Sequence, residues 1–409
     1  MPRTGTAADL GLMAGAPPFP PGGLVTLANW QDPPFNRWAF QHVRDLIPTA
    51  RIRRGRGPAW RLPAAERDLS GIRFRDGARE LTVSELLKRT WTDGFLVLHR
   101  GRIVTERYFN GMTPDTPHLL MSVSKSVTST IAGILAGRGE LDVSSPVTSI
   151  VPELRGTSFE GATVQQLLDM RTGTRFDETY EDPKADVRLY ERVYLWRPRD
   201  GRRVPEDALA YFRTLRNDGE HGGPFRYRSI LTDVLGWVIE RAGGARLPDL
   251  ISRELWQPMG AEFDAEVTVD GHGNPMADGG ISATLRDLAR FGQVFLQWGR
   301  RGRKRIVPRA WIEDTIRGAP DGAQAFEEGE PEGWYPPGAH YRNKWWVYDP
   351  MTPLYYGAGI HGQNVFVHPP SQTVVAKFST WPEALRPSLK RVTVAGVLAI
   401  AEELTRRSR

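Results

Sequence analysis

The sequence predicts an α/β fold in which a run of helices interrupts a sheet. Two pairs of short β-branched and aromatic runs predict hairpins, one at 94–99 and 102–109 and one at 364–368 and 373–378. Between the two hairpins, the pattern from 156 to 270 is one of helices and loops. Strands at both ends of a chain with helices between them are typical of an α/β unit that carries a helical insertion.

We therefore predict a discontinuous α/β domain, formed by residues 1–155 and 271–409, and a mainly helical domain of residues 156–270. A chain of 409 residues is long enough for two such units. The active site is expected at their interface.

Caps and periodic apolar residues place the individual helices. Thr163 and Gln166, three residues later, form a capping box, and Gly173 follows as a stop signal. The expected helices are 163–170, 205–215, 232–242, 247–256, 285–298, 309–317 and 388–404. The Gly/Pro/Glu-rich stretch 318–340 is expected to form a loop.

The composition excludes several kinds of site. The chain has no cysteine, which rules out disulfides, thiolate zinc sites and cysteine nucleophiles. Its histidines show no spacing typical of metal ligands, and no glycine-rich phosphate loop follows a predicted strand. We therefore expect neither a metal nor another cofactor.

Charge and hydropathy argue against nucleic-acid and membrane partners. The net charge of +6 comes mainly from arginine clusters, which are more often solvated loops than nucleic-acid surfaces. No apolar run approaches the length of a membrane span, and the proline-containing N-terminus does not resemble a secretory signal. The expectation is a cytoplasmic enzyme that acts on a small molecule.

One stretch combines a nucleophile with a base. Ser122 lies three residues before Lys125, and positions i and i+3 of a helix share a face. The helix that follows is apolar on most sides, which predicts that it is buried. Burial lowers the pKa of a lysine and can make its amine a base near neutral pH. The pair therefore predicts the Ser-Lys form of a serine hydrolase site.

Such a site also needs a group that carries the proton to the leaving group. Tyr227, in a loop directly before a predicted helix, is the candidate, although a packed loop aromatic is the alternative interpretation. The chain has no G-x-S-x-G motif, which argues against the nucleophile elbow of an α/β-hydrolase.

Several motifs in order resemble those of the penicillin-recognising serine hydrolases, which include class C β-lactamases, related esterases and D,D-peptidases. They are Ser122-x-x-Lys125, Tyr227-x-Ser229, and the segments 167–173 and 279–287. Three further segments, 30–40, 119–126 and 359–364, are similar to those of the 6-aminohexanoate-dimer (nylon oligomer) hydrolases. The resemblance runs from about residue 28 to the C-terminus. It implies a β-lactamase/D,D-peptidase-like fold, with an antiparallel sheet flanked by helices.

The resemblance implies a role for each matching residue. Ser122 would be the nucleophile, Lys125 its base, and Tyr227 the group that passes the proton to the leaving amine. The backbone N–H groups of Ser122 and Ile360 would form the oxyanion hole. The implied reaction passes through an acyl-enzyme, and the implied substrates are short linear amides of ω-amino acids or short esters.

Five more positions are implied to contact substrate: Tyr180, Glu191, Trp346, Asp278 and His361. Tyr180 would face the leaving amide nitrogen, Trp346 would line the pocket, and Glu191 would meet a substrate ammonium group. Core packing is the alternative for Trp346, and a solvated helix face is the alternative for Glu191. Asp278 stands where nylon-oligomer hydrolases usually have a different side chain, which leaves the shape of the pocket open.

One departure limits the choice of substrate. β-Lactamases have Lys-Thr-Gly where this chain has Gly357-Ala358-Gly359, so the cation that would pair with a β-lactam carboxylate is missing. This argues against penicillin as the natural substrate. Two alternatives stay open: a carboxylesterase of the same fold without amidase activity, and a catalytically silent binding protein. The family also suggests a homodimer.

Overall fold

The structure is a computed structural model and describes residues 5–329 and 333–406. Its largest element is a seven-stranded sheet with the order β11-β12-β13-β14-β15-β4-β5, in which every neighbouring pair is antiparallel. The strands are β4 (Thr92–His99), β5 (Arg102–Tyr108), β11 (His340–Arg342), β12 (Trp345–Asp349), β13 (Leu354–Gly359), β14 (Gln363–His368) and β15 (Thr373–Ser379). Because β4 pairs with β15, the two ends of the chain build one sheet.

Both predicted hairpins are confirmed within this sheet. β4 pairs with β5, and β14 pairs with β15. Every residue of β4 and of β15 is buried. Burial on both faces explains why these two strands have nearly continuous apolar sequences.

The described residues also form three smaller sheets. One has four strands in the order β1-β7-β8-β6, and the pairs β2-β3 and β9-β10 make the other two. Their bounds are β1 (Thr49–Ile52), β2 (Arg73–Asp76), β3 (Arg79–Thr82), β6 (His118–Leu119), β7 (Ala265–Thr268), β8 (Ile281–Ala283), β9 (Arg300–Arg301) and β10 (Lys304–Arg305). β7 lies inside the range predicted to be mainly helical, yet it pairs with strands from outside that range.

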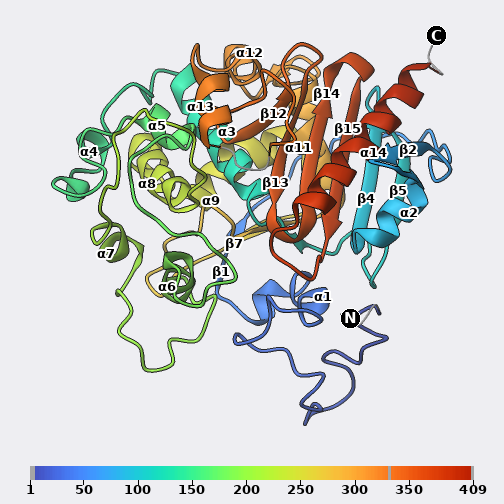
Figure 1. The fold of residues 1–409 in the computed structure, drawn as a ribbon, viewed down its shortest axis with the longest axis horizontal. Helices are drawn as coiled ribbons and strands as arrows, with labels where there is room; N and C mark the ends of the chain where they lie inside the picture. The colour runs from blue at the N-terminus through green and yellow to red at the C-terminus, as the bar shows by residue number, and fades with distance from the viewer. Residues whose placement is uncertain (1–4, 330–332, 407–409) are drawn as a thin grey trace.

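Helices cover both faces of the large sheet (Figure 1). α14 (Pro387–Arg406) crosses the front of the sheet in this view, while α11 (Leu285–Leu296) packs against β4, β14 and β15 from behind. α3 (Val123–Gly137) packs against β13 and β14. The antiparallel sheet flanked by helices that the resemblance implied is confirmed.

The regular elements of residues 147–259, called the helical part below, are all helical and lie beside the large sheet in Figure 1. Its elements are α4 (Val147–Ile150), η2 (Pro152–Leu154), α5 (Val164–Leu168), α6 (Asp186–Val193), α7 (Ala208–Phe212), α8 (Ile230–Gly243), α9 (Leu247–Leu250), η3 (Ile251–Trp256) and α10 (Gln257–Met259). The predicted capping box is confirmed: Thr163 Oγ1 accepts from the amide of Gln166 at 3.2 Å, and Gln166 Oε1 accepts from the amide of Thr163 at 2.8 Å. α7 starts later than predicted because Asp207 caps it.

Shorter elements complete the chain: α1 (Asn36–Ala39), η1 (Val43–Asp45), α2 (Val83–Arg89), α12 (Arg309–Arg317), α13 (Gly322–Gly329), η4 (Ile360–Gly362) and η5 (Pro369–Ser371). α13 corrects the prediction of a loop over 318–340. Its Phe326 is buried with its ring centroid 5.2 Å from that of Phe225, so tertiary packing supports a helix in a sequence rich in glycine. No helix in the described ranges has the length and apolar character needed to cross a membrane.

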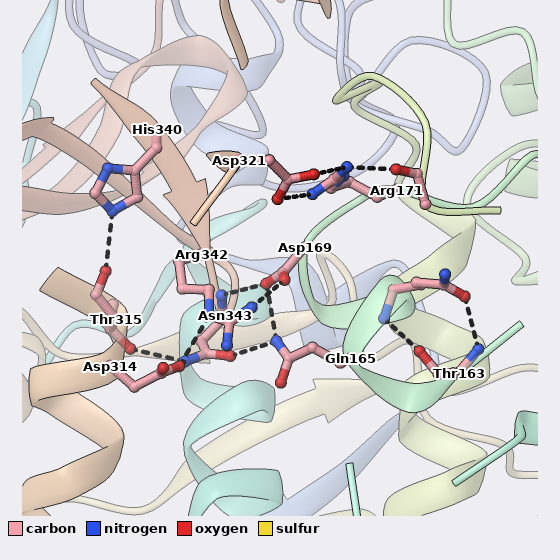
Figure 2. Close-up of polar contacts among 12 residues, drawn as sticks. Thr163, Gln165, Asp169, Arg171, Asp314, Thr315, Asp321, His340, Arg342 and Asn343 are labelled. Atoms are coloured by element: carbon pink, nitrogen blue, oxygen red, sulfur yellow. Dashed lines mark hydrogen bonds and ion pairs between the residues drawn. The ribbon is translucent and has the colours of Figure 1, made fainter. Parts of the chain in front are cut away.

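A polar network ties the helical part to the large sheet (Figure 2). Asn343, in the β11–β12 turn, donates through Nδ2 to Asp314 Oδ2 at 3.1 Å and to Thr315 Oγ1 at 3.0 Å. Its Oδ1 accepts from Gln165 Nε2 of α5 at 3.0 Å. Arg342 forms ion pairs with both Asp169 and Asp314.

The same turn also contacts α3. Ser129 Oγ donates to the carbonyl oxygen of Asn343 at 2.8 Å, and Ser126 Oγ donates to that of Lys344 at 2.8 Å. Asn343 and Lys344 both have positive φ, of 51° and 63°. The turn therefore links the start of α3 to the helical part through hydrogen bonds rather than through apolar packing alone.

Candidate active site

Ser122 and Lys125 meet at the start of α3 as the i, i+3 spacing predicts. Ser122 is the residue before the first turn of the helix, and Lys125 lies within that turn. Lys125 Nζ donates to Ser122 Oγ at 2.8 Å. Lys125 is fully buried, whereas Ser122 is 9% exposed and lines a cavity. A hydroxyl that faces a cavity with an amine directly behind it has the arrangement of a nucleophile and its proton acceptor.

The backbone that precedes Ser122 is strained. Met121 has a φ of 45°, which is uncommon for a residue other than glycine. The surrounding structure holds this conformation: Leu120 N donates to the carbonyl oxygen of Ile281 at 2.8 Å, and Ile281 N donates to Ser124 Oγ at 3.1 Å. Strained residues of this kind cluster at functional sites, and here the strain lies next to the serine hydroxyl.

Carboxylates around Lys125 reverse the pKa shift that was predicted for it. Lys125 Nζ also donates to the carbonyl oxygen of Asp278 at 3.0 Å and to its carboxylate Oδ2 at 3.3 Å. Burial alone lowers the pKa of Lys125, but Tyr227 and the carboxylates of Asp278, Glu178 and Asp233 raise it above its ordinary value. The prediction of a lowered lysine pKa is therefore wrong, because it left out charges from distant parts of the sequence.

Asp233 and Asp278 form a buried carboxyl pair behind this lysine. Asp233 Oδ1 accepts from the backbone amide of Asp278 at 3.1 Å. Burial, together with the charge of Asp278, holds the pKa of Asp233 well above its ordinary value. Of the two carboxyl groups, that of Asp278 is the one that contacts Lys125 directly.

Tyr227 completes the set from the loop that leads into α8. Lys125 Nζ lies 5.2 Å from the centroid of the Tyr227 ring, and the ring stacks on Trp346 with the centroids 5.7 Å apart. Burial raises the pKa of Tyr227, while the charge of Lys125 and hydrogen bonds with Ser122 and Lys125 oppose that rise. The phenol thus lies beside both groups that would exchange a proton.

The end of β13 lies against the backbone of Ser122. A Cβ on Gly359 would lie 2.7 Å from the carbonyl oxygen of Leu120 and 3.0 Å from the amide nitrogen of Ser122. Only a glycine therefore fits at this position without a shift of the backbone. The next residue, Ile360, lines the same cavity as Ser122. The two amides named as the expected oxyanion hole thus belong to segments in direct contact.

The cavity at Ser122 has a volume of about 260 Å³. Its lining residues are Ser122, Glu178, Tyr180, Tyr227, Trp346, Ala358, Gly359, Ile360, Asn364, Trp381, Ala384, Leu385, Arg386, Pro387 and Lys390. They come from the start of α3, from the helical part, from β12 to β14 with the turn at Ile360, and from the segment 381–390 that leads into α14. The described residues contain no cluster of three or more side chains that could hold a metal ion.

The structure brings two of the five expected substrate contacts into this cavity. Trp346 lines it and stacks on Tyr227, and Tyr180 lines it with its hydroxyl donating to Glu178 Oε1 at 2.6 Å. Asp278 instead lies behind Lys125 and is not among the lining residues.

His361 and Glu191 also lie away from the cavity lining. His361 is 3% exposed, and its Nδ1 bonds to the carbonyl oxygen of Trp381 at 2.7 Å. Burial lowers the pKa of His361 to about 4, so its ring is neutral and supports the turn after Ile360. Glu191 is 3% exposed and forms ion pairs with Arg188 and Arg197.

Sequence reasoning missed Glu178 as a residue of the site. Its Oε1 accepts from Tyr180, and its Oε2 accepts from the backbone amide of Ser229 at 2.6 Å. Burial raises its pKa, which the charge of Lys125 opposes. The available signal was its position two residues before Tyr180, but only the fold brings this carboxylate next to Ser229.

Comparisons with known proteins agree with this geometry. A family model described as Beta-lactamase matches residues 82–397. The 6-aminohexanoate-dimer hydrolase of Paenarthrobacter ureafaciens is 39% identical over 366 residues, which are 88% of this chain and 89% of that protein. Esterase EstB of Burkholderia gladioli is 30% identical over 154 residues, which are 36% of this chain and 38% of the esterase.

A solved structure from Bacillus anthracis, assigned as a 6-aminohexanoate-dimer hydrolase, has a TM-score of 0.86 and 28% sequence identity. The match covers 93% of this chain and 97% of that one. The chain therefore belongs to the β-lactamase family, as a hydrolase of that fold similar to the 6-aminohexanoate-dimer hydrolases.

Proposed function

We propose that the chain is a serine hydrolase that works through an acyl-enzyme on short linear amides of ω-amino acids and on short esters. The observation that carries the proposal is the contact of Lys125 Nζ with Ser122 Oγ at 2.8 Å, beside the phenol of Tyr227. A hydroxyl hydrogen-bonded to an amine, with a phenol beside them, provides a nucleophile and a path for its proton.

The proposed reaction has two halves. Ser122 Oγ attacks the carbonyl carbon, its proton passes to the Lys125–Tyr227 pair, and the amides of Ser122 and Ile360 hold the oxyanion. The bond to the leaving nitrogen or oxygen then breaks as Tyr227 donates a proton to that atom. Water, which gives its proton to the same pair, attacks the ester, and Ser122 leaves with its proton restored.

The raised pKa of Lys125 sets a condition on the first step. An ammonium group cannot accept the serine proton, so the pair of Lys125 and Tyr227 must first lose one proton between them. The pair then accepts one proton in either of its forms, amine with phenol or ammonium with phenolate. We propose that this deprotonated pair is the active form.

Similarity supports the amide class of substrate, since the relative that matches most of this chain is named for hydrolysis of the 6-aminohexanoate dimer. The match to Esterase EstB over part of the chain supports a carboxylesterase without amidase activity as the second candidate. A catalytically silent binding protein has less support, because all three side chains of the proposed reaction are present and lie together at one cavity.

Two measurements on wild type and Ser122→Ala test the proposal. A fluorophosphonate probe is expected to label the wild type and not the variant; equal labelling of both would contradict a Ser122 nucleophile. Amine release from the 6-aminohexanoate dimer is then compared with hydrolysis of a p-nitrophenyl ester. A brisk ester reaction with an inert amide would favour the carboxylesterase.

Three further features stay predictions. They are the division into residues 1–155 with 271–409 and residues 156–270, a cytoplasmic location, and a homodimer. Size-exclusion chromatography with light scattering tests the last of these.

A further inference from the structure

The predicted partner of Glu191 is a substrate ammonium group, but two arginines already occupy this carboxylate. Arg188 Nη1 donates to the two Glu191 oxygens at 2.9 and 2.8 Å, and Arg197 Nε donates to Oε2 at 2.5 Å. One negative charge between two guanidinium groups leaves the cluster net positive. A substrate ammonium group would therefore be repelled rather than bound at this point.

A second cavity, of about 190 Å³, lies at this cluster. It is lined by Tyr180, Glu181, Pro183, Arg188, Arg192 and Arg197. Tyr180 also lines the cavity at Ser122, so the two cavities share a wall. Arg188 lies over the Tyr180 ring, 5.6 Å from its centroid, and donates to the Tyr180 carbonyl oxygen.

Arg192 contributes a cation that Glu191 does not pair. Its Nη1 donates to the carbonyl oxygen of Arg188 at 2.6 Å, and its buried Nε has no hydrogen-bond partner among the described residues. No carboxylate of the described ranges lies within ion-pair distance of it. Guanidinium groups with donors to spare are well suited to bind a planar carboxylate.

The cavity at Ser122 offers no alternative place for an ammonium group. Glu178 is the one acidic residue among its described lining residues. One of its oxygens accepts from Tyr180 and the other from the amide of Ser229, and burial raises its pKa against the opposing charge of Lys125. The other charged residues of the lining, Arg386 and Lys390, are basic.

We infer that the cavity formed by Arg188, Arg192 and Arg197 binds a carboxylate at one end of the substrate. The inference rests on the proposed function and narrows it: within the linear amides of ω-amino acids, the enzyme selects substrates by their carboxylate end. The planar carboxylate accepts from Arg192, beside the Arg188–Glu191–Arg197 cluster.

Two series of linear amides test the selection. One series varies the acyl chain (hexanoyl, 6-aminohexanoyl, adipoyl) on a constant amine, and the other varies the end of the amine on a constant acyl group. In one of the two series, kcat/KM of the carboxylate member is expected to exceed that of its neutral counterpart roughly tenfold or more. In the same series, kcat/KM of the ammonium member is expected to be lower than that of the neutral counterpart. No dependence on charge in either series, or a preference for ammonium, would overturn the inference.

Two variants locate the effect. Arg192→Gln is expected to remove the preference for the carboxylate, so that kcat/KM for the carboxylate member falls to that of its neutral counterpart. The matched control is Arg199→Gln, which removes one arginine charge from the exposed loop after α6. This variant should keep the preference for the carboxylate substrate. A preference that survives in Arg192→Gln would contradict the assignment.

Binding without turnover separates this inference from the proposed function. The Ser122→Ala protein is titrated calorimetrically with the carboxylate amide that the wild type prefers, or with 6-aminohexanoate dimer if no amide reacts. Binding that Arg192→Gln weakens by roughly tenfold supports the cavity even where no Ser122-dependent hydrolysis is found. If the Ser122→Ala protein does not bind the amide while the wild type shows Ser122-dependent hydrolysis, the carboxylate-binding cavity is contradicted and the proposed function stands. If neither binding nor Ser122-dependent hydrolysis is found, both the cavity and the proposed function are contradicted.

Discussion

At Lys125, burial and charge act in opposite directions on the same amine. The carboxylate of Asp278, 3.3 Å away, is among the groups that raise its pKa above the ordinary value. The proton on Lys125 must leave the Lys125–Tyr227 pair before Ser122 can give up its own. Activity should therefore rise with pH as this pair deprotonates.

Asp278→Asn is expected to move the acid limb of the pH profile to lower pH. The carboxylate raises the pKa of Lys125, so its loss lowers that pKa, and the deprotonated pair forms at lower pH. The shift should be about one pH unit or more, as is typical of an opposite charge at this separation. The profile of kcat/KM on a neutral p-nitrophenyl ester measures it, with the exposed Asp115→Asn as control. An unmoved limb, or one moved to higher pH, would show that Asp278 does not tune the pair.

Tyr227→Phe should remove the proton path while keeping the packing. The ring still stacks on Trp346, so the midpoint of thermal unfolding should change little. The value of kcat/KM is expected to fall by about 10²–10⁴, the usual contribution of a positioned acid or base. Tyr108→Phe, whose hydroxyl bonds to Glu106 in β5, is the matched control. A variant that keeps wild-type kcat/KM would assign proton transfer to another group.

Among the elements, the contact of β13 with the start of α3 decides the shape of the proposed oxyanion hole. Gly359 allows this close approach, because a Cβ added at that position would lie only 3.0 Å from the Ser122 amide nitrogen. Any side chain there must push the two segments apart. The positive φ of His361, 59°, then turns the chain directly after Ile360.

Gly359→Ala should lower kcat by about 10²–10³, the cost of one misplaced oxyanion donor. Gly71→Ala, at an exposed position where no heavy atom lies within 4 Å of a Cβ, is the control and should be neutral. The measurement is kcat on the ester substrate, together with a melting curve. Wild-type kcat in a folded Gly359→Ala would argue against a hole built from Ser122 and Ile360.

Asn343 stabilises the β11–β12 turn in two ways: its backbone adopts the positive φ that the turn needs, and its side chain forms hydrogen bonds to neighbouring segments. Asn343→Ala leaves the hydrogen-bonding groups of Asp314, Thr315 and Gln165 without this partner and keeps a left-handed backbone at a residue that tolerates it less well. The free energy of unfolding should fall by about 2–4 kcal/mol, as measured by denaturant titration. The exposed Gln324→Ala should change it by less than about 0.5 kcal/mol. Equal stabilities would mean that the network in Figure 2 contributes nothing net.

In the whole molecule, a second buried lysine couples stability to pH. Lys377 of β15 is fully buried, donates to Ser379 Oγ, and burial lowers its pKa from 10.5 to about 7. Between these two values the unfolded chain binds a proton that the folded chain does not. Stability must therefore rise with pH across this window.

Comparison with Lys377→Met isolates this effect. The free energy of unfolding of the wild type minus that of the variant should increase from pH 7 to pH 10, by at most about 1.4 kcal/mol per pH unit. Denaturant titrations at several pH values measure it. A difference that stays constant would show that Lys377 remains protonated in the folded state.

The sequence predicted what depends on local pattern. The two hairpins, the Thr163 capping box and the pairing of Ser122 with Lys125 all follow from residues a few positions apart. The four-stranded sheet could not be predicted in the same way, because its strands have only two to four residues and pair across long separations.

The candidate site shows the same limit. The sign of the Lys125 pKa shift depends on Asp278 and Glu178, which only the fold brings near. Sequence similarity marked Glu191 as an ammonium partner, but Arg188, three residues earlier on α6, and Arg197 occupy it. This pairing was missed because α6 was not among the helices predicted from the sequence. Local motifs therefore predicted the pairing of Ser122 with Lys125, and contacts between distant segments set the charges around that pair.

The most direct measurement is intact-protein mass spectrometry of the enzyme quenched during turnover of a p-nitrophenyl ester, followed by peptide mapping. The wild type should carry the mass of one acyl group, located on Ser122, and the adduct should accumulate when Tyr227→Phe slows its hydrolysis. Turnover without an adduct on Ser122, or an adduct that persists in Ser122→Ala, would contradict the proposed acyl-enzyme.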